Sequence, residues 1–230
     1  MAEPSGTIEI LQNPRGATLI PARTHYNPLL RPPLLTLASP APPPSLLSRQ
    51  SDSQVRITAV TTTGDGCPAG SFSTNINAAG TVATLGFDAY QSFVGPGTSG
   101  SDREKHCELF VTLRYPLGCT AASLTTTYHG FATLQPGVSG VVASTYNLSP
   151  GSLTNGNPAS TVLSGVQWAN GDVYTRNDVT SARVSVSSQQ QRDVSFVIRN
   201  RLLLTAGSSS QEGAITADDV TLTVTGQSAC

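Results

Sequence analysis

Residues 107–115 read Cys-Glu-Leu-Phe-Val-Thr-Leu-Arg-Tyr, and this stretch decides the fold class. Apolar and polar side chains alternate along it with the two-residue period of a half-buried β-strand. Every second side chain, from Cys107 to Tyr115, therefore points to the same face. Pro116 ends the strand, because proline has no backbone N–H to donate to a neighbouring strand.

Similar strand patterns, separated by Gly, Pro, Asn and Ser turns, recur from Val55 to the end of the chain. Asn77–Gly80 and Asn170-Gly171 are typical of β-hairpin turns, and the longest run is expected to bend near Gly130. No helical period persists. The pattern predicts a single antiparallel β-sandwich, jelly-roll or immunoglobulin-like in layout, over residues 51–230. The predicted strands are 55–60, 71–76, 81–87, 107–115, 121–134, 138–148, 161–168, 172–179, 184–187, 194–205 and 215–225.

The first 50 residues differ from the rest, because they hold ten of the sixteen prolines. Such a density excludes a helix or a central strand, so we expect residues 1–50 to be a disordered proline-rich arm or a leader with a wrongly assigned start. The start is acidic, and the most apolar segment, 29–38, is interrupted by Arg31, Pro32 and Pro33. A signal peptide is therefore not recognisable.

The composition excludes several classes of function. Only 12% of the residues are charged, the net charge is −1, and Lys105 is the sole lysine. A nucleic-acid-binding protein needs a basic face and a membrane-surface protein needs a basic amphipathic stretch. Neither is present, and no apolar run approaches the length of about 20 residues that crosses a bilayer. The oligomeric state cannot be read from these features.

Four cysteines stand at Cys67, Cys107, Cys119 and Cys230. Structural zinc sites usually bring cysteines in close pairs, and no such pair occurs. An even number of cysteines in a Ser/Thr-rich β protein favours disulfides and an oxidising, extracellular compartment. We predict no metal site and no cofactor.

Several side chains are candidates for chemistry by type alone. Trp168, beside the Asn170-Gly171 turn, could form a sugar-stacking platform or could belong to the core. The sequon at Asn147 is a candidate glycosylation site. Asp218-Asp219 with Thr216 could contribute to a calcium site, but adjacent strand residues point to opposite faces. For a Ser/His/Asp triad, the other candidates are His106 and His129 with Asp88 and Asp102. The candidates for paired carboxylates are Asp102, Glu104, Glu108, Asp172, Asp178, Asp193, Glu212, Asp218 and Asp219. Further candidates for stacking on sugar rings are Tyr90, Tyr115, Tyr128, Tyr146 and Tyr174. Glu104 and Glu108 are interpreted as solvated edge charges that discourage edge-to-edge pairing.

Four ordered motifs resemble a family of fungal secreted proteins, catalogued as domain of unknown function 4360. They are Gly66-Cys67-Pro68, Phe93-Val94-Gly95-Pro96-Gly97, Lys105-His106-Cys107-Glu108-Leu109 and Leu113-Arg114-Tyr115-Pro116-Leu117-Gly118. The resemblance covers residues 54–230 and implies an exported protein with no established activity. It also implies a Cys67–Cys107 disulfide. The chain departs from the family at Cys119 and at Gln189–Gln191, where members carry an aromatic residue and a cysteine, and Cys119 and Cys230 are then left to pair.

Two functions follow as hypotheses. The first is a non-catalytic extracellular module that binds a cell-wall polysaccharide or an extracellular protein, because its low charge and Thr-rich surface offer hydrogen bonds rather than electrostatic attraction. The second is a polysaccharide-active enzyme of the glycoside hydrolase type with paired carboxylates. An open groove with two facing acids would favour the enzyme, and exposed aromatic side chains on a flat face would favour binding.

Overall fold

A computed structural model describes residues 54–154, 158–184 and 191–225. The predictions for the arm at 1–50 and for a leader lie outside these residues, and so does Cys230. The predicted boundary between the arm and the sandwich therefore stays a prediction. Within the described residues, no helix is long and apolar enough to cross a membrane.

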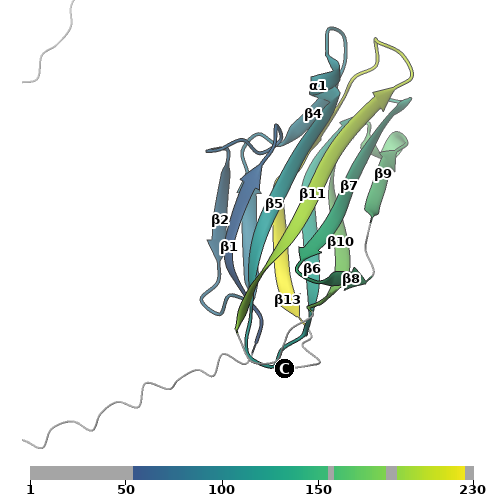
Figure 1. The fold of residues 1–230 in the computed structure, drawn as a ribbon. Coiled ribbons are helices and arrows are strands. Elements are labelled where there is room, and N and C mark those ends of the chain that lie inside the picture. The colour runs from purple at the N-terminus through teal and green to yellow at the C-terminus, as the bar shows by residue number, and fades with distance from the viewer. Residues whose placement is uncertain (1–53, 155–157, 185–190, 226–230) are drawn as a thin grey trace, which may run out of the picture. The chain divides into compact units, whose positions relative to one another are not determined.

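Over the described residues, one sheet has five strands in the order β1-β5-β11-β7-β9 (Figure 1). Every neighbouring pair is antiparallel. Its strands are β1 (Arg56–Thr63), β5 (Glu104–Tyr115), β11 (Arg192–Ala206), β7 (Val138–Ser149) and β9 (Ala159–Ser164). We call it the first sheet.

The other strands form the second sheet, whose main path over the described residues is β2-β3-β13-β6-β10-β8. β12 pairs with one end of β6 and with β4, again antiparallel. Its strands are β2 (Phe72–Ile76), β3 (Val82–Phe87), β13 (Asp219–Thr225), β6 (Ala121–Leu134), β10 (Asp172–Arg183), β8 (Ser152–Thr154), β12 (Gly213–Thr216) and β4 (Gln91–Val94). Two short helices, α1 (Gly100–Arg103) and η1 (Val166–Trp168), complete the described elements.

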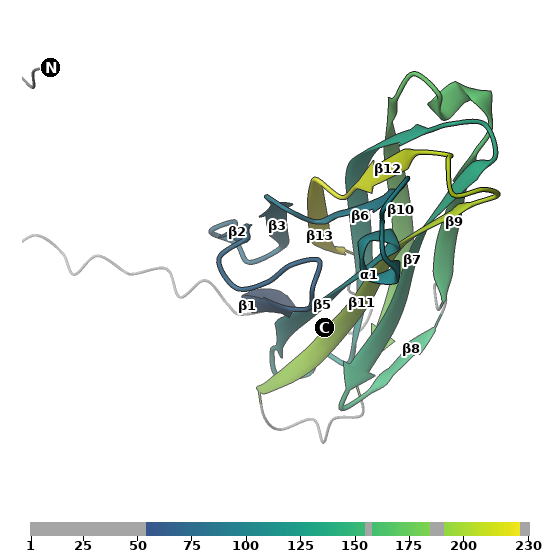
Figure 2. The same ribbon diagram turned by 90° about the horizontal axis from the view of Figure 1, so that it is seen from above.

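The two sheets lie face to face, as Figure 2 shows from one end of the strands. Side chains alternate between buried and exposed along β5, β6, β7 and β11. The buried members of both sheets join in one hydrophobic core, with Leu109 from β5, Leu124 from β6 and Phe196 from β11 almost fully enclosed. The predicted antiparallel β-sandwich is confirmed.

The local strand predictions hold better than the predicted connections. The Asn77–Gly80 turn does join β2 to β3, and the Asn77 side-chain oxygen accepts hydrogen bonds from the backbone N–H groups of Thr81 and Val82, at 2.8 and 3.1 Å. The hairpin predicted at Asn170-Gly171 is wrong. β9 pairs with β7 in the first sheet, whereas β10 pairs with β6 in the second, so this turn carries the chain between layers. Gly171 has a φ of +79°, and a Cβ there would lie 2.3 Å from the Phe131 ring.

The interpretation of Glu104 and Glu108 as edge charges is wrong for Glu108, because β5 is paired on both sides at that position. Their strand, β5, lies between β1 and β11. Its outward acids are opposed by arginines of β11: Glu108 Oε1 lies 2.7 Å from Arg199 Nε, and Glu104 Oε1 lies 2.6 Å from Arg201 Nε. Both acids belong to cross-strand ion pairs with β11, and Glu104 lies beyond the last residue of β5 that pairs with β1.

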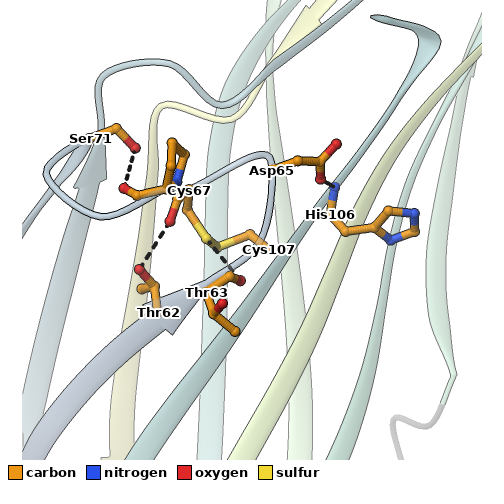
Figure 3. The surroundings of a disulfide bond; sticks show 8 residues. Thr62, Thr63, Asp65, Cys67, Ser71, His106 and Cys107 are labelled. Carbon is orange, nitrogen blue, oxygen red and sulfur yellow. Dashed lines mark hydrogen bonds between the residues drawn. A yellow bond between two sulfur atoms is a disulfide. The ribbon is translucent and has the colours of Figure 1, made fainter. Parts of the chain in front are cut away.

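The predicted Cys67–Cys107 disulfide is present, with Cα atoms 5.4 Å apart, and both cysteines are buried. It joins the loop after β1 to the beginning of β5 (Figure 3). Backbone groups reinforce this junction: Gly66 N–H donates to His106 C=O at 2.8 Å, and the Asp65 carboxylate accepts from His106 N–H at 2.8 Å. Cys119 is buried, and its predicted pairing with Cys230 stays a prediction.

We expect Cys67→Ala/Cys107→Ala to lower the free energy of unfolding by about 2–4 kcal/mol. The disulfide closes a loop of 40 residues, whose conformational entropy in the unfolded chain the cross-link reduces. Chemical denaturation of the variant and the parent measures the loss. An unchanged midpoint and slope would contradict this expectation.

Candidate ligand-binding face

The outer face of the second sheet carries a regular array of threonines, which we call the threonine face: Thr84, Thr125, Thr127, Thr221 and Thr223. Thr84, Thr221 and Thr127 stand side by side on β3, β13 and β6, and Thr223 stands beside Thr125 in the next row. Their sequence neighbours Leu124, Thr126 and Leu222 point into the core. The alternation of strand residues therefore places the threonines outward together.

Hydrogen bonds hold several of these hydroxyl groups in place. The Oγ1 atoms of Thr84 and Thr221 lie 3.1 Å apart, and Thr127 Oγ1 donates to Asn177 Oδ1 of β10 at 2.7 Å. A hydroxyl held in this way loses little further freedom when it binds a ligand, which lowers the cost of association.

One row further along β6, His129 stands opposite Asp219 of β13. The two side chains are hydrogen-bonded, with His129 Nδ1 2.8 Å from Asp219 Oδ1. In the described part of the chain, no hydroxyl group is hydrogen-bonded to the His129 ring, so a nucleophile for the candidate Ser/His/Asp triad is not assembled here. His106 lies on the other sheet, with Nε2 3.1 Å from Glu104 Oε1.

The next row is apolar. Phe131 of β6 is 39% exposed, and Val173 of β10, its register partner, is 71% exposed. On the other side of Phe131, the Thr216 hydroxyl accepts a hydrogen bond from Phe131 N–H at 3.1 Å. The ring lies over Gly171, where any Cβ would collide with it. The sheet thus presents the Phe131 ring beside an exposed valine, a glycine and a threonine hydroxyl.

A groove of about 460 Å³ continues the same face beyond Phe131. Thr133 and Gln135, the following outward residues of β6 and its turn, lie along it. Its lining residues are Val94, Gly95, Pro96, Thr133, Gln135, Ala169, Glu212, Gly213 and Ala214. Glu212 is the one carboxylate in this lining, so the described groove does not hold the two facing acids that glycoside hydrolysis needs.

Trp168 ends η1 and immediately precedes Ala169 of the groove wall. It is partly buried and packs against the core. The indole Nε1 is buried and has no hydrogen-bond partner among the described residues. Trp168 therefore lies beside the groove without presenting a fully exposed ring.

The five tyrosines considered as platforms are all core residues: Tyr90, Tyr115, Tyr128, Tyr146 and Tyr174. Burial raises the pKa of each hydroxyl, to about 12 for Tyr115 and Tyr128. Phe93 of β4 is one exposed aromatic residue of this sheet, and the one on β6 is Phe131. Sequence reasoning missed it, although its odd-numbered position shares a face with Thr125 and Thr127.

Asp178, one of the candidate acids, is buried in an ionic network in the core. Arg176 Nη2 lies 2.7 Å from Asp178 Oδ2, and Arg176 Nη1 donates to Val142 C=O at 2.6 Å. The Tyr146 hydroxyl donates to the same Asp178 oxygen. The guanidinium lies 4.2 Å from the Tyr128 ring centroid. The Arg176 guanidinium and the Asp178 carboxylate are thus both bound to other groups in the core.

The outer face of the first sheet contrasts with the threonine face, because it is charged and its charges are paired. Besides the two pairs already described, Arg114 Nε lies 2.8 Å from Asp193 Oδ1 and holds the pKa of that carboxyl below its usual range. Asn147, the predicted glycosylation site, is exposed on β7 of this sheet. A glycan there would stand on the opposite side of the sandwich from the threonine face.

The remaining candidates do not converge. Asp102 accepts hydrogen bonds from Ser99, whose backbone N–H, at 2.8 Å, lowers the pKa of the carboxyl most. Asp218 accepts a hydrogen bond from the Thr216 hydroxyl at 2.7 Å, whereas Asp219 is hydrogen-bonded to His129. The two carboxylates therefore do not bind a common partner. In the residues that the structure describes, no group of three or more His, Cys, Asp or Glu side chains could hold a metal ion.

Comparison with known proteins gives one clear relationship and two slight ones. An uncharacterised secreted protein of Arthroderma benhamiae is 32% identical over 167 residues, which is 73% of this chain and 66% of the relative's length. The chain thus spans a little under two thirds of that relative.

Two solved structures share 13% identity. TmCBM61 in complex with β-1,4-galactotriose has a TM-score of 0.23, over 73% of this chain and 89% of the other. A structure described as CBM4 has a TM-score of 0.19, over 71% of this chain and 76% of the other. Scores this low support no argument. The family model described as domain of unknown function (DUF4360) matches residues 53–229, and the chain therefore belongs to that family.

Proposed function

We propose that this protein is a non-catalytic extracellular module that binds polysaccharide through the outer face of its second sheet. The carrying observation is the continuity of three features along β6: the groove at Thr133, the exposed ring of Phe131 and the threonine face. Sugars present apolar ring faces and hydroxyl groups, so an aromatic ring next to polar groups suits them.

The extracellular location is part of the proposal. A buried disulfide between Cys67 and Cys107 persists in oxidising compartments, and the related protein of Arthroderma benhamiae is a secreted one. The groove favours binding over hydrolysis, because Glu212 has no second acid facing it within the described lining. Trp168 contributes from the side in this proposal, by supporting the wall at Ala169.

The test compares two phenylalanines of similar exposure on opposite faces. Phe131 of the second sheet is 39% exposed, and Phe110 of the first sheet is 36% exposed. We expect Phe131→Ala to weaken polysaccharide binding by about 1 kcal/mol, or roughly fivefold in Kd, because a stacking surface is lost. Phe110→Ala is expected to leave the Kd unchanged.

Binding is measured by co-sedimentation with insoluble glucans and chitin and by titration with their oligosaccharides. The sole tryptophan, Trp168, adjoins the groove, so its fluorescence reports occupancy. Melting curves of both variants control for folding, and product analysis of the same samples tests for hydrolysis. Equal losses in the two variants, or capture of an extracellular protein with no polysaccharide bound, would reject the proposal.

A further inference from the structure

We infer that the ligand is an extended, uncharged polysaccharide chain that lies along β6, from the groove across Phe131 onto the threonine face. This inference rests on the proposed function and names its substrate class. Residues 125, 127, 129, 131 and 133 of β6 alternate with buried neighbours and so share the outer face. At about 3.4 Å per residue they span roughly 27 Å, which accommodates several sugar units.

The charges along this path select against an anionic chain. The outward register partners of these β6 residues on β10, β13 and β12 include no lysine or arginine in the described chain. The acids Glu212, at the groove, and Asp218, beside Thr216, have no cationic partner among the described residues. Asp219 is already paired with His129. A polyanion would therefore meet repulsion without a compensating cation.

The threonine face gives the far end of the path its hydrogen-bonding groups. Thr127 and Thr221 stand in one row between Thr84 and Asn177, and the hydroxyl contacts within that row orient them. Neutral hydroxyl groups bind sugar hydroxyls without the desolvation cost that burying an ion carries. The first sheet offers paired charges at the corresponding rows, which explains why the proposed path uses the second sheet.

The experiment measures Kd for neutral β-glucan oligosaccharides of increasing length, and for the carboxymethylated form of the best chain. We expect the affinity to keep rising with length after the chain is long enough to fill the groove. Carboxymethylation is expected to weaken binding about tenfold at low ionic strength, and added salt should narrow the gap because it screens repulsion.

The matched variants are Thr127→Val on the outward side of β6 and Thr145→Val on the outward side of β7, where Thr127 is half-buried and Thr145 is exposed. Each replaces a hydroxyl by a methyl group and keeps a β-branched side chain. Thr127→Val is expected to weaken long oligosaccharides about fivefold and to leave the shortest ones unchanged, whereas Thr145→Val changes neither.

The outcomes separate the two proposals. A Kd that does not improve with length, equal Kd values for Thr127→Val and Thr145→Val, or equal binding of the carboxymethylated chain would overturn the extended neutral path. Such results would leave the proposed binding module standing if Phe131→Ala still weakened short oligosaccharides. No binding of any oligosaccharide would reject both.

Discussion

We expect the protein to unfold cooperatively between about pH 10 and pH 12, with its stability falling steeply as the pH rises. Five buried tyrosines have a pKa above the ordinary value of 10 because their burial disfavours the phenolate: Tyr90, Tyr115, Tyr128, Tyr146 and Tyr174. In the unfolded chain these groups titrate near pH 10.

Stability falls as the pH rises because the folded state keeps tyrosine protons that the unfolded state releases. Below about pH 10 both states keep the tyrosine protons, and the stability is fully present. Between pH 10 and the raised native pKa, about 12 for Tyr115 and Tyr128, the unfolded state releases protons that the native state retains. Each such proton lowers the stability by about 1.4 kcal/mol per pH unit, so five lower it by up to about 7 kcal/mol per pH unit. This is comparable to the whole stability of a typical domain.

Circular dichroism and phenolate absorbance, followed together against pH, measure this transition. The two signals should change together, because the buried hydroxyls ionise when the sandwich opens. Tyr115→Phe is the control, since the Tyr115 hydroxyl is buried with no hydrogen-bond partner among the described residues. This variant should unfold at a slightly higher pH. Phenolate formation by more than one tyrosine near pH 10 with an intact β spectrum would contradict the expectation, because Tyr26 is the one tyrosine outside the described residues.

The second large effect concerns the buried ion pair of Arg176 and Asp178. We expect Asp178→Leu to lower the free energy of unfolding by about 3–5 kcal/mol, because it leaves the Arg176 guanidinium in the core without its carboxylate. Tyr146 also loses the acceptor of its hydroxyl. Denaturant titration at neutral pH measures the change.

Two further variants make this prediction specific. Arg176→Met/Asp178→Leu removes both charges, and it should lose less stability than Asp178→Leu alone, because no buried charge is left unpaired. Glu108→Gln breaks the surface ion pair of Glu108, which is 34% exposed, with Arg199, which is 55% exposed. This variant should lower the free energy of unfolding by less than about 1 kcal/mol. If the surface variant were as destabilised as Asp178→Leu, burial would not be the cause.

The binding prediction and the stability predictions use separate parts of the sandwich. Phe131 and Thr127 are on the outer face of β6, whereas Tyr128, between them in sequence, points into the core. Variants of the outer face can therefore test binding with little change in the packing that the core variants disturb. Successive side chains of a strand point to opposite faces, so binding and core packing can be changed independently at neighbouring positions.

Features that depend on near neighbours were predictable from the sequence. The alternation in 107–115 predicted β5, and the run rich in Thr and aromatic residues at 121–134 predicted β6, because the side-chain period and the residue preferences of a strand are local properties. The Asn77–Gly80 hairpin was predictable for the same reason, since Asn77 bonds to backbone groups four and five residues away. The Cys67–Cys107 disulfide came from family resemblance rather than from local pattern.

Only the tertiary structure decided which strands become neighbours, and with them the candidate site. β9 and β10 read as a hairpin, yet packing placed them in different sheets, because a tight turn determines the chain reversal and not the partner strand. Likewise, residues 215–225 read as one strand but divide into β12 and β13. The row of Thr84, Thr221 and Thr127 joins three strands far apart in sequence, and the ion pair at Asp178 depends on which face of β10 is buried. Local propensity predicts neither the threonine row nor the buried face of β10, since both arise from the burial of two sheets against each other.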